Sequence, residues 1–90
     1  MTLNLKIESS FKNKIKKLQK KHFDLSKLEI VLDLLVNQKV IPNKYKDHAL
    51  KGNLQGYREC HIEKNWLLLY KIEDNNLILI STGTHDDFFK

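Results

Sequence analysis

The chain has little cysteine, proline or glycine, and it has no long hydrophobic run. Its 90 residues include one cysteine, one proline and three glycines. A single thiol cannot form a disulfide within the chain, which fits a reducing compartment. No apolar run approaches the roughly 20 residues that span a bilayer, and the first residues lack the hydrophobic segment of a signal peptide. These absences exclude a disulfide-stapled fold, and they predict a cytoplasmic protein with no membrane partner.

Arginine is also scarce, although the chain is basic. Lysine and arginine total 16 against 11 aspartates and glutamates, a formal net charge of +5, yet Arg58 is the only arginine. The guanidinium fork that binds phosphates and base edges bidentately is therefore almost absent. Because no helix-turn-helix pattern is present either, the sequence disfavours a regulator that binds DNA by itself.

The positive charge is concentrated near the N-terminus. Residues 1–22 hold seven lysines against one acidic residue, Glu8. A basic stripe of this kind is typical of proteins that bind a polyanion, such as RNA or an acidic partner. The alternative is that these lysines only solvate the outer face of an amphipathic helix, and charge patterning alone leaves both interpretations open.

Apolar periodicity predicts one strand and two helices in the first part of the chain. Residues 3–8 alternate apolar and polar side chains, which is the pattern of a short strand. We expect a first helix capped by Ser9 or Ser10. A second helix is expected to start at Asp24 or Ser26. The apolar stripe of this second helix is wide, which indicates burial against a sheet.

The second half of the chain predicts an antiparallel meander. After a connection over residues 37–56, strand candidates follow at residues 57–62, 66–72 and 77–82, separated by short turns typical of hairpins. Both faces of the middle candidate are apolar, which indicates a central strand. We therefore predict a single α+β domain over residues 1–90, in which an N-terminal strand and two helices pack on one face of an antiparallel sheet.

Three of the four histidines fall at junctions in the second half. His48 lies in the connection, His61 on a predicted strand, and His85 after the last strand. An imidazole titrates near neutral pH, so it can donate or accept a proton under cellular conditions. Cleavage of RNA without a metal ion needs a base for the 2′-hydroxyl, an acid for the departing 5′-oxygen, and positive charge on the phosphate. A basic domain with three histidines has these groups, although each histidine has an alternative as an exposed or packing side chain.

A metal site is the other use for histidine and cysteine. Cys60 and His61 are adjacent on a predicted strand, so their side chains point to opposite faces and cannot easily share an ion. No CxxC or HxxxH spacing is present. We expect no metal and no cofactor. We also expect Cys60 to be buried against the helices together with Ile62, while Glu59 shares the face of His61.

Four segments of the second half resemble one known family. They are KDHALKG at 46–52, GYRECHI at 56–62, WLLLY at 66–70, and TGTH at 82–85 with FF at 88–89. Together, and in this order after a strand and two helices, they resemble the YafQ branch of the RelE superfamily. Those proteins are toxins of bacterial type II toxin–antitoxin modules, and their fold is RelE-like and similar to that of microbial ribonucleases.

This resemblance implies an activity, partners and site residues. The implied activity is that of a ribosome-dependent mRNA endoribonuclease, or mRNA interferase, which is inhibited by a cognate antitoxin. Operator DNA is implied as a partner only through the toxin–antitoxin complex. By position, the catalytic histidines of the family match His48, His61 and His85, and an acidic position near them matches Glu59.

Two aromatic residues, Trp66 and Phe89, also match positions that the family implicates in activity. Phe89 would lie over a base or over the scissile region of the RNA. For Trp66, packing in the core is an equal alternative, because a large aromatic side chain on a central strand usually packs.

Two positions depart from the family pattern. The family commonly has an aspartate before the tryptophan and an arginine four residues before the last histidine, and here these are Asn65 and Ser81. An asparagine cannot act as a carboxylate base, and removal of one charge-stabilising donor lowers a rate by about 10²–10³-fold. The alternative function is therefore a catalytically attenuated homologue that acts as an antitoxin- or ribosome-binding module. If the chain is active, another cation must bind the phosphate, and the nearest candidates in the sequence are Lys46, Lys51 and Lys64.

Overall fold

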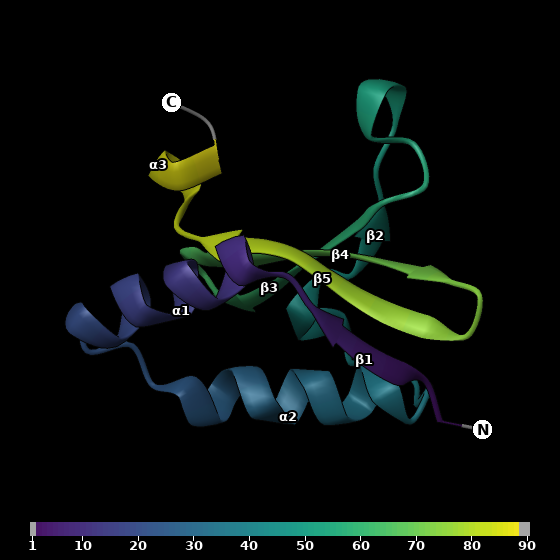
Figure 1. The fold of residues 1–90 in the computed structure, drawn as a ribbon, viewed down its shortest axis with the longest axis horizontal. Coiled ribbons are helices and arrows are strands. Elements are labelled where there is room, and N and C mark those ends of the chain that lie inside the picture. The colour runs from purple at the N-terminus through teal and green to yellow at the C-terminus, as the bar shows by residue number, and fades with distance from the viewer. Residues whose placement is uncertain (1, 89–90) are drawn as a thin grey trace.

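The computed structural model describes residues 2–88, and its elements follow the predicted order. Figure 1 shows two helices, then a meander of strands, and a short C-terminal helix. The elements are β1 (Asn4–Ile7), α1 (Ser9–Lys20), α2 (Leu25–Val36), the 3-10 turn η1 (Asn43–Tyr45), β2 (His48–Ala49), the 3-10 turn η2 (Gly52–Leu54), β3 (Arg58–Glu63), β4 (Trp66–Glu73), β5 (Asn76–Gly83) and α3 (His85–Phe88).

One five-stranded sheet organises the molecule, in the order β1-β5-β4-β3-β2. β4 is the central strand, as its two apolar faces predicted. Strands β2 to β5 pair antiparallel, whereas β1 pairs in parallel with β5, so the sheet is mixed at this edge. His48, which we expected in a connection without regular structure, lies on the two-residue strand β2 at the opposite edge.

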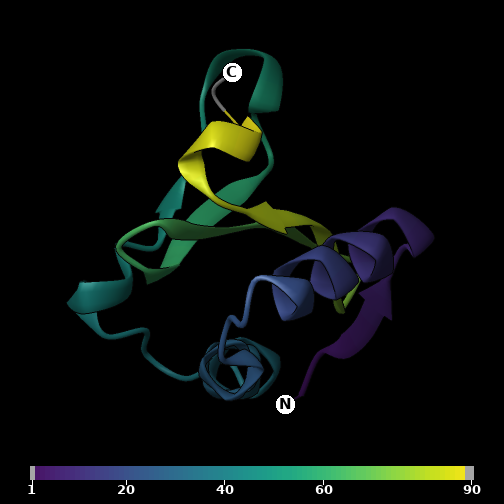
Figure 2. The ribbon, with the colours of Figure 1, turned by 90° about the vertical axis from the view of Figure 1, so that its left-hand side faces the viewer.

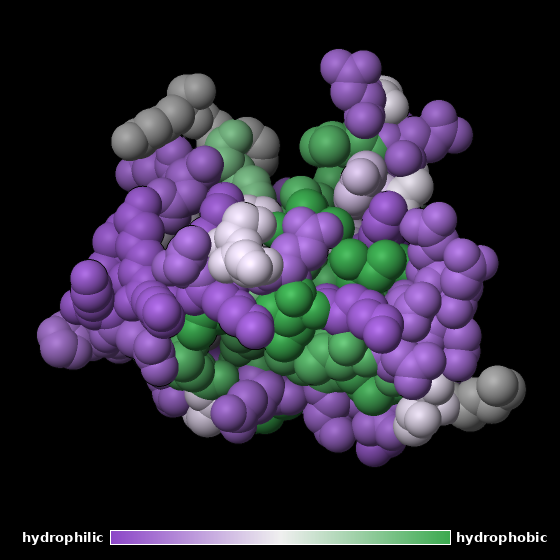
Figure 3. Space-filling view, in the orientation of Figure 1, coloured by the Kyte–Doolittle hydropathy of each residue, from purple (hydrophilic) through white to green (hydrophobic). Residues whose placement is uncertain are grey.

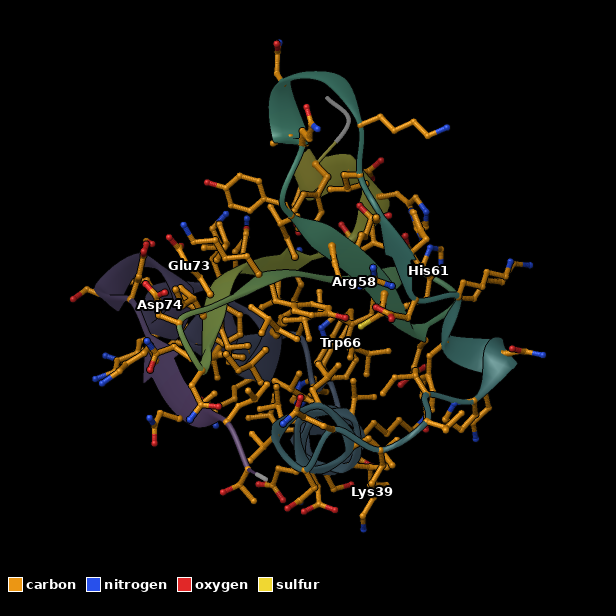
Figure 4. The ribbon with its side chains drawn as sticks, turned by 90° about the vertical axis from the view of Figure 1, so that its right-hand side faces the viewer. Lys39, Arg58, His61, Trp66, Glu73 and Asp74 are labelled. Atoms are coloured by element: carbon orange, nitrogen blue, oxygen red, sulfur yellow. The ribbon has the colours of Figure 1, made fainter. Side chains whose placement is uncertain are left out.

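The hairpin between β4 and β5 forms for a reason that is visible in the sequence. Asp74 and Asn75 separate the two strands and have φ angles of 49° and 64°. Two successive positive φ angles make the tight turn that matches the twist of the flanking strands, and aspartate and asparagine tolerate them well. The turn points toward the viewer in Figure 4, where Asp74 is labelled.

The core lies between the sheet and the two long helices. Figure 2 shows α2 end-on beneath the sheet, with α1 beside it. From α2, Leu28, Val31 and Leu35 are buried, and Phe11 and Leu18 are buried from α1. These side chains meet the buried face of the strands, which includes Cys60, Ile62, Trp66, Leu68, Tyr70, Leu77 and Leu79. The expected burial of Cys60 and Ile62 against the helices is therefore confirmed.

The two helix starts differ in how they are capped. Glu8 is the N-cap of α1 and makes no side-chain capping hydrogen bond. The prediction of a Ser9 or Ser10 cap was wrong, because the helix begins directly after β1 and both serines are already inside it. Of the two predicted starts of the second helix, Asp24 is the N-cap of α2, since its carboxylate accepts a hydrogen bond from the Ser26 N–H at 3.0 Å.

The edge strand β1 leaves part of its apolar face in solvent. Leu5 and Ile7 are 42% and 41% exposed, whereas Leu3, just before the strand, is buried. An edge strand has a neighbour on one side only, so its side chains are covered less completely than those of β4. No helix within residues 2–88 is long and apolar enough to cross a bilayer.

Gly83, the last residue of β5, positions the short helix that carries His85. A Cβ built on Gly83 would lie 2.6 Å from the Asp87 Oδ2. The absence of a side chain therefore lets α3 fold back onto the end of β5. The same Asp87 oxygen accepts a hydrogen bond from the Thr84 N–H at 2.8 Å, which closes this turn.

Trp66 tests the account of the core. Its side chain is fully buried between the sheet and α2 (Figure 4), and its Nε1–H donates to the Thr82 Oγ1 at 2.9 Å. Trp66→Phe should lower the free energy of unfolding by about 2 kcal/mol, through lost volume and an unmade hydrogen bond. Urea unfolding measures this change. Val40→Ala, at a 91% exposed position, is the control and should stay within about 0.5 kcal/mol of the wild type; an equally small effect of Trp66→Phe would contradict the account.

Candidate functional site

The face of the sheet that the helices leave open carries the candidate site. In the strand register Glu59 pairs with Leu69, which in turn pairs with Ser81. His61 lies two residues after Glu59 on β3, so the two side chains point to the same face of the sheet. Paired residues share a face, so this face is opposite to the one that carries Cys60. In Figure 1, α3 and the segment around η2 rise above it, and Figure 3 shows the surface hollowed between them.

Glu59 lies between two of the histidines. Its Oε1 is 3.8 Å from the His48 Nε2 and 3.9 Å from the His61 Nε2. His48 reaches this position because β2 pairs with β3 directly opposite Glu59. The carboxylate is mostly covered, with 14% of its side chain exposed, so it can attract a protonated ring with less screening than a surface carboxylate.

His85 completes the group from α3. Its ring centroid is 5.8 Å from that of His61, in an edge-to-face arrangement. Asn65, in the turn between β3 and β4, fixes this ring: the His85 N–H donates to the Asn65 Oδ1 at 3.1 Å, and the His85 Nδ1 is 2.8 Å from the same oxygen. The structure thus brings together all three histidines that the sequence singled out.

Hydrogen bonds determine which ring nitrogen of His85 carries the proton. A backbone N–H can only donate, so the Asn65 atom that it contacts acts as an acceptor. The Nδ1 of His85 contacts the same oxygen and must therefore donate to it. In the neutral ring Nε2 is then the nitrogen able to accept a proton. His48 has the same tautomer, because its Nδ1 lies 2.6 Å from the Lys46 carbonyl oxygen, which can only accept.

His61 has a different electrostatic environment. Its partial burial holds the pKa of the ring below the ordinary value, and the neighbouring positive charge of Lys46 lowers the pKa further. The Glu59 carboxylate opposes both effects by raising the pKa. Because the net shift is downward, the neutral form of His61 is favoured more than that of a free imidazole.

A groove of about 760 Å³ opens beside His61 and His85. It runs from the end of β3 past η1 toward α2, and four lysines line it, together with Ile30, Tyr45, Ile62 and Glu63. The lysines are Lys27, Lys44, Lys46 and Lys64. Two of the predicted substrate-binding lysines, Lys46 and Lys64, therefore line the groove. The third, Lys51, does not line it and precedes η2 as an exposed side chain.

Two residues that the sequence analysis did not single out hold His48 in place. The carboxylate of Asp47 accepts hydrogen bonds from the Tyr70 hydroxyl and from Arg58 Nη2, the latter at 2.9 Å. Tyr70 is buried on the central strand, so it anchors the segment that precedes His48. No local pattern in the sequence indicated this contact, because Asp47 and Tyr70 are 23 residues apart and meet only in the folded sheet.

Cys60 takes no part in this site. Burial raises the pKa of its thiol to about 12, so the reactive thiolate is scarce at neutral pH. Within residues 2–88, no three histidine, cysteine, aspartate or glutamate side chains are placed to hold a metal ion.

Comparison with known proteins identifies the family. A family model described as the bacterial toxin of the type II toxin–antitoxin system, YafQ, matches residues 3–90. The chain belongs to the YafQ toxin family. This match confirms the resemblance that the four sequence segments indicated.

Individual YafQ proteins match along the whole chain. The mRNA interferase toxin YafQ of Escherichia coli strain K12 is 38% identical over 87 residues, covering 96% of this chain and 95% of that protein. YafQ in the crystal structure of the E. coli DinJ–YafQ toxin–antitoxin complex superposes with a TM-score of 0.90 at 36% identity, covering 100% of both chains. A copper-bound mutant toxin from Helicobacter pylori superposes with a TM-score of 0.92 at 37% identity, covering 97% of this chain and 99% of that chain. These structures confirm the predicted RelE-like α+β fold.

The remaining predicted site residues fall in different places. Trp66 is 0% exposed, so it packs in the core and does not contact a substrate; of the two alternatives, the core role is the one that the structure supports. Asn65 orients His85, as described above. Phe89 lies outside the described residues.

Ser81 occupies the position where the YafQ family commonly has an arginine, and a cation lies beside it. The Nζ of Lys14 in α1 donates to the Ser81 Oγ at 2.7 Å. The sequence analysis named Lys46, Lys51 and Lys64 as the nearest cations, and none of these is the lysine that contacts Ser81. The helical spacing could have indicated that Lys14 faces the sheet, because it lies three residues after Phe11 and four before Leu18, the buried residues of α1.

The tautomer of His85 can be measured directly. Asn65→Ala removes the acceptor of the Nδ1–H, so the neutral ring should shift toward the Nε2–H tautomer that free imidazoles favour in water. Asn65→Asp keeps an acceptor and should retain the Nδ1–H form. Nitrogen-15 NMR of the histidine rings distinguishes the two tautomers. The same His85 tautomer in Asn65→Ala and in the wild type would contradict the assignment.

Proposed function

We propose that this YafQ family member is a ribosome-dependent mRNA endoribonuclease that inhibits translation by acid–base catalysis. One observation carries the proposal: three imidazoles and one carboxylate lie together on the open face, and two of the imidazoles line a groove that lysines surround. The E. coli relative, which is named an mRNA interferase toxin, supports the same activity.

The proton transfers are assigned to His48 and His85. A base must take the proton of the 2′-hydroxyl as it attacks the phosphorus, and an acid must protonate the departing 5′-oxygen. Both rings hold Nδ1 in a hydrogen bond, which keeps their orientation and leaves proton exchange to Nε2. One of them acts as the base and the other, in its protonated form, as the acid. His61 and Glu59 lie between them and stabilise the charge that moves during the reaction.

The groove supplies the electrostatic part of the proposal. Lys46 and Lys64 line it together with His61 and His85, where a sugar–phosphate chain would pass. Lysines act on phosphates as point charges and tolerate many backbone geometries. Such a surface binds RNA with little preference for sequence, so selection of the cleavage site would come from the ribosome that presents the message.

The partners follow from the family. A cognate antitoxin holds the toxin inactive, as DinJ is bound to YafQ in the E. coli complex. Operator DNA would be bound only by the toxin–antitoxin complex, because the chain carries a single arginine and its sequence has no helix-turn-helix pattern. Action on translating ribosomes would require the protein to be in the cytoplasm.

Removal of His85 tests the proposed chemistry. In a translating lysate, the wild type should produce new mRNA ends, and His85→Ala should lower their rate of formation by about 10²–10⁴-fold, the usual contribution of a general acid or base. His22→Asn is the matched control, because His22 is exposed in the turn after α1 and asparagine tolerates its φ of 64°. Sequencing of the mRNA ends measures the rates.

Two outcomes would contradict the proposal. Equal cleavage by His85→Ala and the wild type would remove His85 from the reaction. No cleavage by the folded wild type, together with binding of ribosomes or of an antitoxin, would favour the alternative of an attenuated homologue that acts as a binding module.

A further inference from the structure

Lys14 differs from the other lysines of α1. It is half-buried, whereas Lys12, Lys16, Lys17 and Lys20 are exposed. Its Nζ donates to the Ser81 Oγ at 2.7 Å, and this serine is itself buried on β5. This contact holds the Lys14 ammonium beside Ser81, which pairs with Leu69 in the same row of the sheet as Glu59.

The charge of this ammonium has no carboxylate partner. Within residues 2–88, Lys14 forms no ion pair, and its hydrogen-bond partner is a neutral hydroxyl. The neighbouring Lys17 is different, because its Nζ is 3.3 Å from the Asp87 Oδ1. Asp87 also accepts from Thr84, so its two oxygens are occupied by Lys17 and by the turn that begins α3. A partly desolvated cation without a counter-charge is a position prepared for an anion.

The ammonium lies near the candidate site. Ser81 is two strands away from Glu59, through Leu69, and two strand spacings amount to about 10 Å. Along the chain, Ser81 is four residues before His85. A small cavity of about 180 Å³, lined by Lys14, Lys17, Leu18, Thr82, Gly83 and Asp87, opens at this place between α1 and the end of β5.

We propose that Lys14 is a substrate-binding residue, which holds a backbone phosphate of the RNA next to the one that is cleaved. This inference rests on the proposed function and extends it, since it gives the RNA a direction: from the lysine-lined groove, past the histidines, toward α1. The Ser81 hydroxyl positions the ammonium and can also donate to a phosphate oxygen.

Single charge changes on α1 test this contact. Lys14→Gln removes the charge but keeps a polar group that can bond to Ser81, and Lys14→Arg keeps the charge. Lys12→Gln is the matched control: it removes one charge from the same helix at an exposed position about 200° around the axis from Lys14. Thermal unfolding of all three variants reports whether the fold is unchanged.

Binding of an uncleavable RNA is the primary measurement. The probe is a labelled 2′-O-methyl oligoribonucleotide, titrated at several salt concentrations. Lys14→Gln should weaken binding by about ten- to a hundredfold, as expected for the loss of a hydrogen bond to a charged group. It should also reduce the slope of log K against log salt by about 0.7, the contribution of one phosphate contact on a single strand. Lys14→Arg should retain the wild-type slope.

Several results would overturn the inference. These are an equal slope in Lys14→Gln and Lys12→Gln, no binding of the oligonucleotide by the wild type, or a lower unfolding temperature in Lys14→Gln with unchanged RNA binding. The last result would make Lys14 a structural link between α1 and β5. Weakened binding of the cognate antitoxin with an unchanged RNA slope would assign the ammonium to that interface instead.

Cleavage on ribosomes separates this inference from the proposed function. If the wild type cuts mRNA and Lys14→Gln cuts as well as Lys12→Gln, the phosphate contact is wrong while the nuclease stands. If no variant cuts mRNA but the salt slope still falls in Lys14→Gln, the phosphate contact stands while the proposed catalysis fails. If the nuclease activity and the phosphate contact are both correct, Lys14→Gln should cleave mRNA with a raised KM and a smaller change in kcat.

Discussion

The register of β3 between β2 and β4 is the constraint on which the candidate site depends. Side chains alternate along a strand, so a slip by one residue would turn Glu59 and His61 into the core and bring Cys60 and Arg58 to the open face. Burial of Cys60 and Ile62 opposes such a slip. The same pairing places His48 opposite Glu59, and the turn after β3 places Asn65 beside His85. Packing energy on one face therefore fixes the chemistry on the other.

Short polar contacts then set the orientation of the His48 and His85 rings. Asp47, which precedes His48, accepts a hydrogen bond from the buried Tyr70. The Asn65 side chain contacts both the backbone N–H and the ring Nδ1 of His85. Orientation of this kind matters for proton transfer, because an acid or base must reach the reacting atom within hydrogen-bond distance. A neutral amide at position 65 serves this purpose as an acceptor, so the departure from the family's aspartate is compatible with a working site.

Much of the fold could be predicted from the sequence, because its signals are local. Short strand-like segments between turn residues marked β3, β4 and β5 to within about one residue, and residues 73–76 marked the turn between β4 and β5. The helix cap at Asp24 was visible for the same reason. The cap at Ser9 or Ser10 was not correct, since nothing local showed that the helix would start directly after β1.

The site was predicted only in part, because its residues meet over long separations. The histidines were found by residue type and by family resemblance, but the partners that orient them were not. The contact between Lys14 and Ser81 spans 67 residues, and that between Asp47 and Tyr70 spans 23. The first contact depends on how α1 docks on β5, and the second depends on how β2, β3 and β4 pair, so neither partner could be identified from neighbouring residues in the sequence. Trp66 shows the reverse case, in which a family motif residue belongs to the core.

The pH dependence of single-turnover mRNA cleavage on ribosomes tests the central claim most directly. The account places proton transfer on His48 and His85, so the rate of the wild type should follow a bell-shaped pH profile, with one limb from the base and one from the acid. His48→Ala should lose one limb of this pH profile, and His85→Ala should lose the other. A profile that keeps both limbs in both variants would show that other groups move the protons, and would contradict the account.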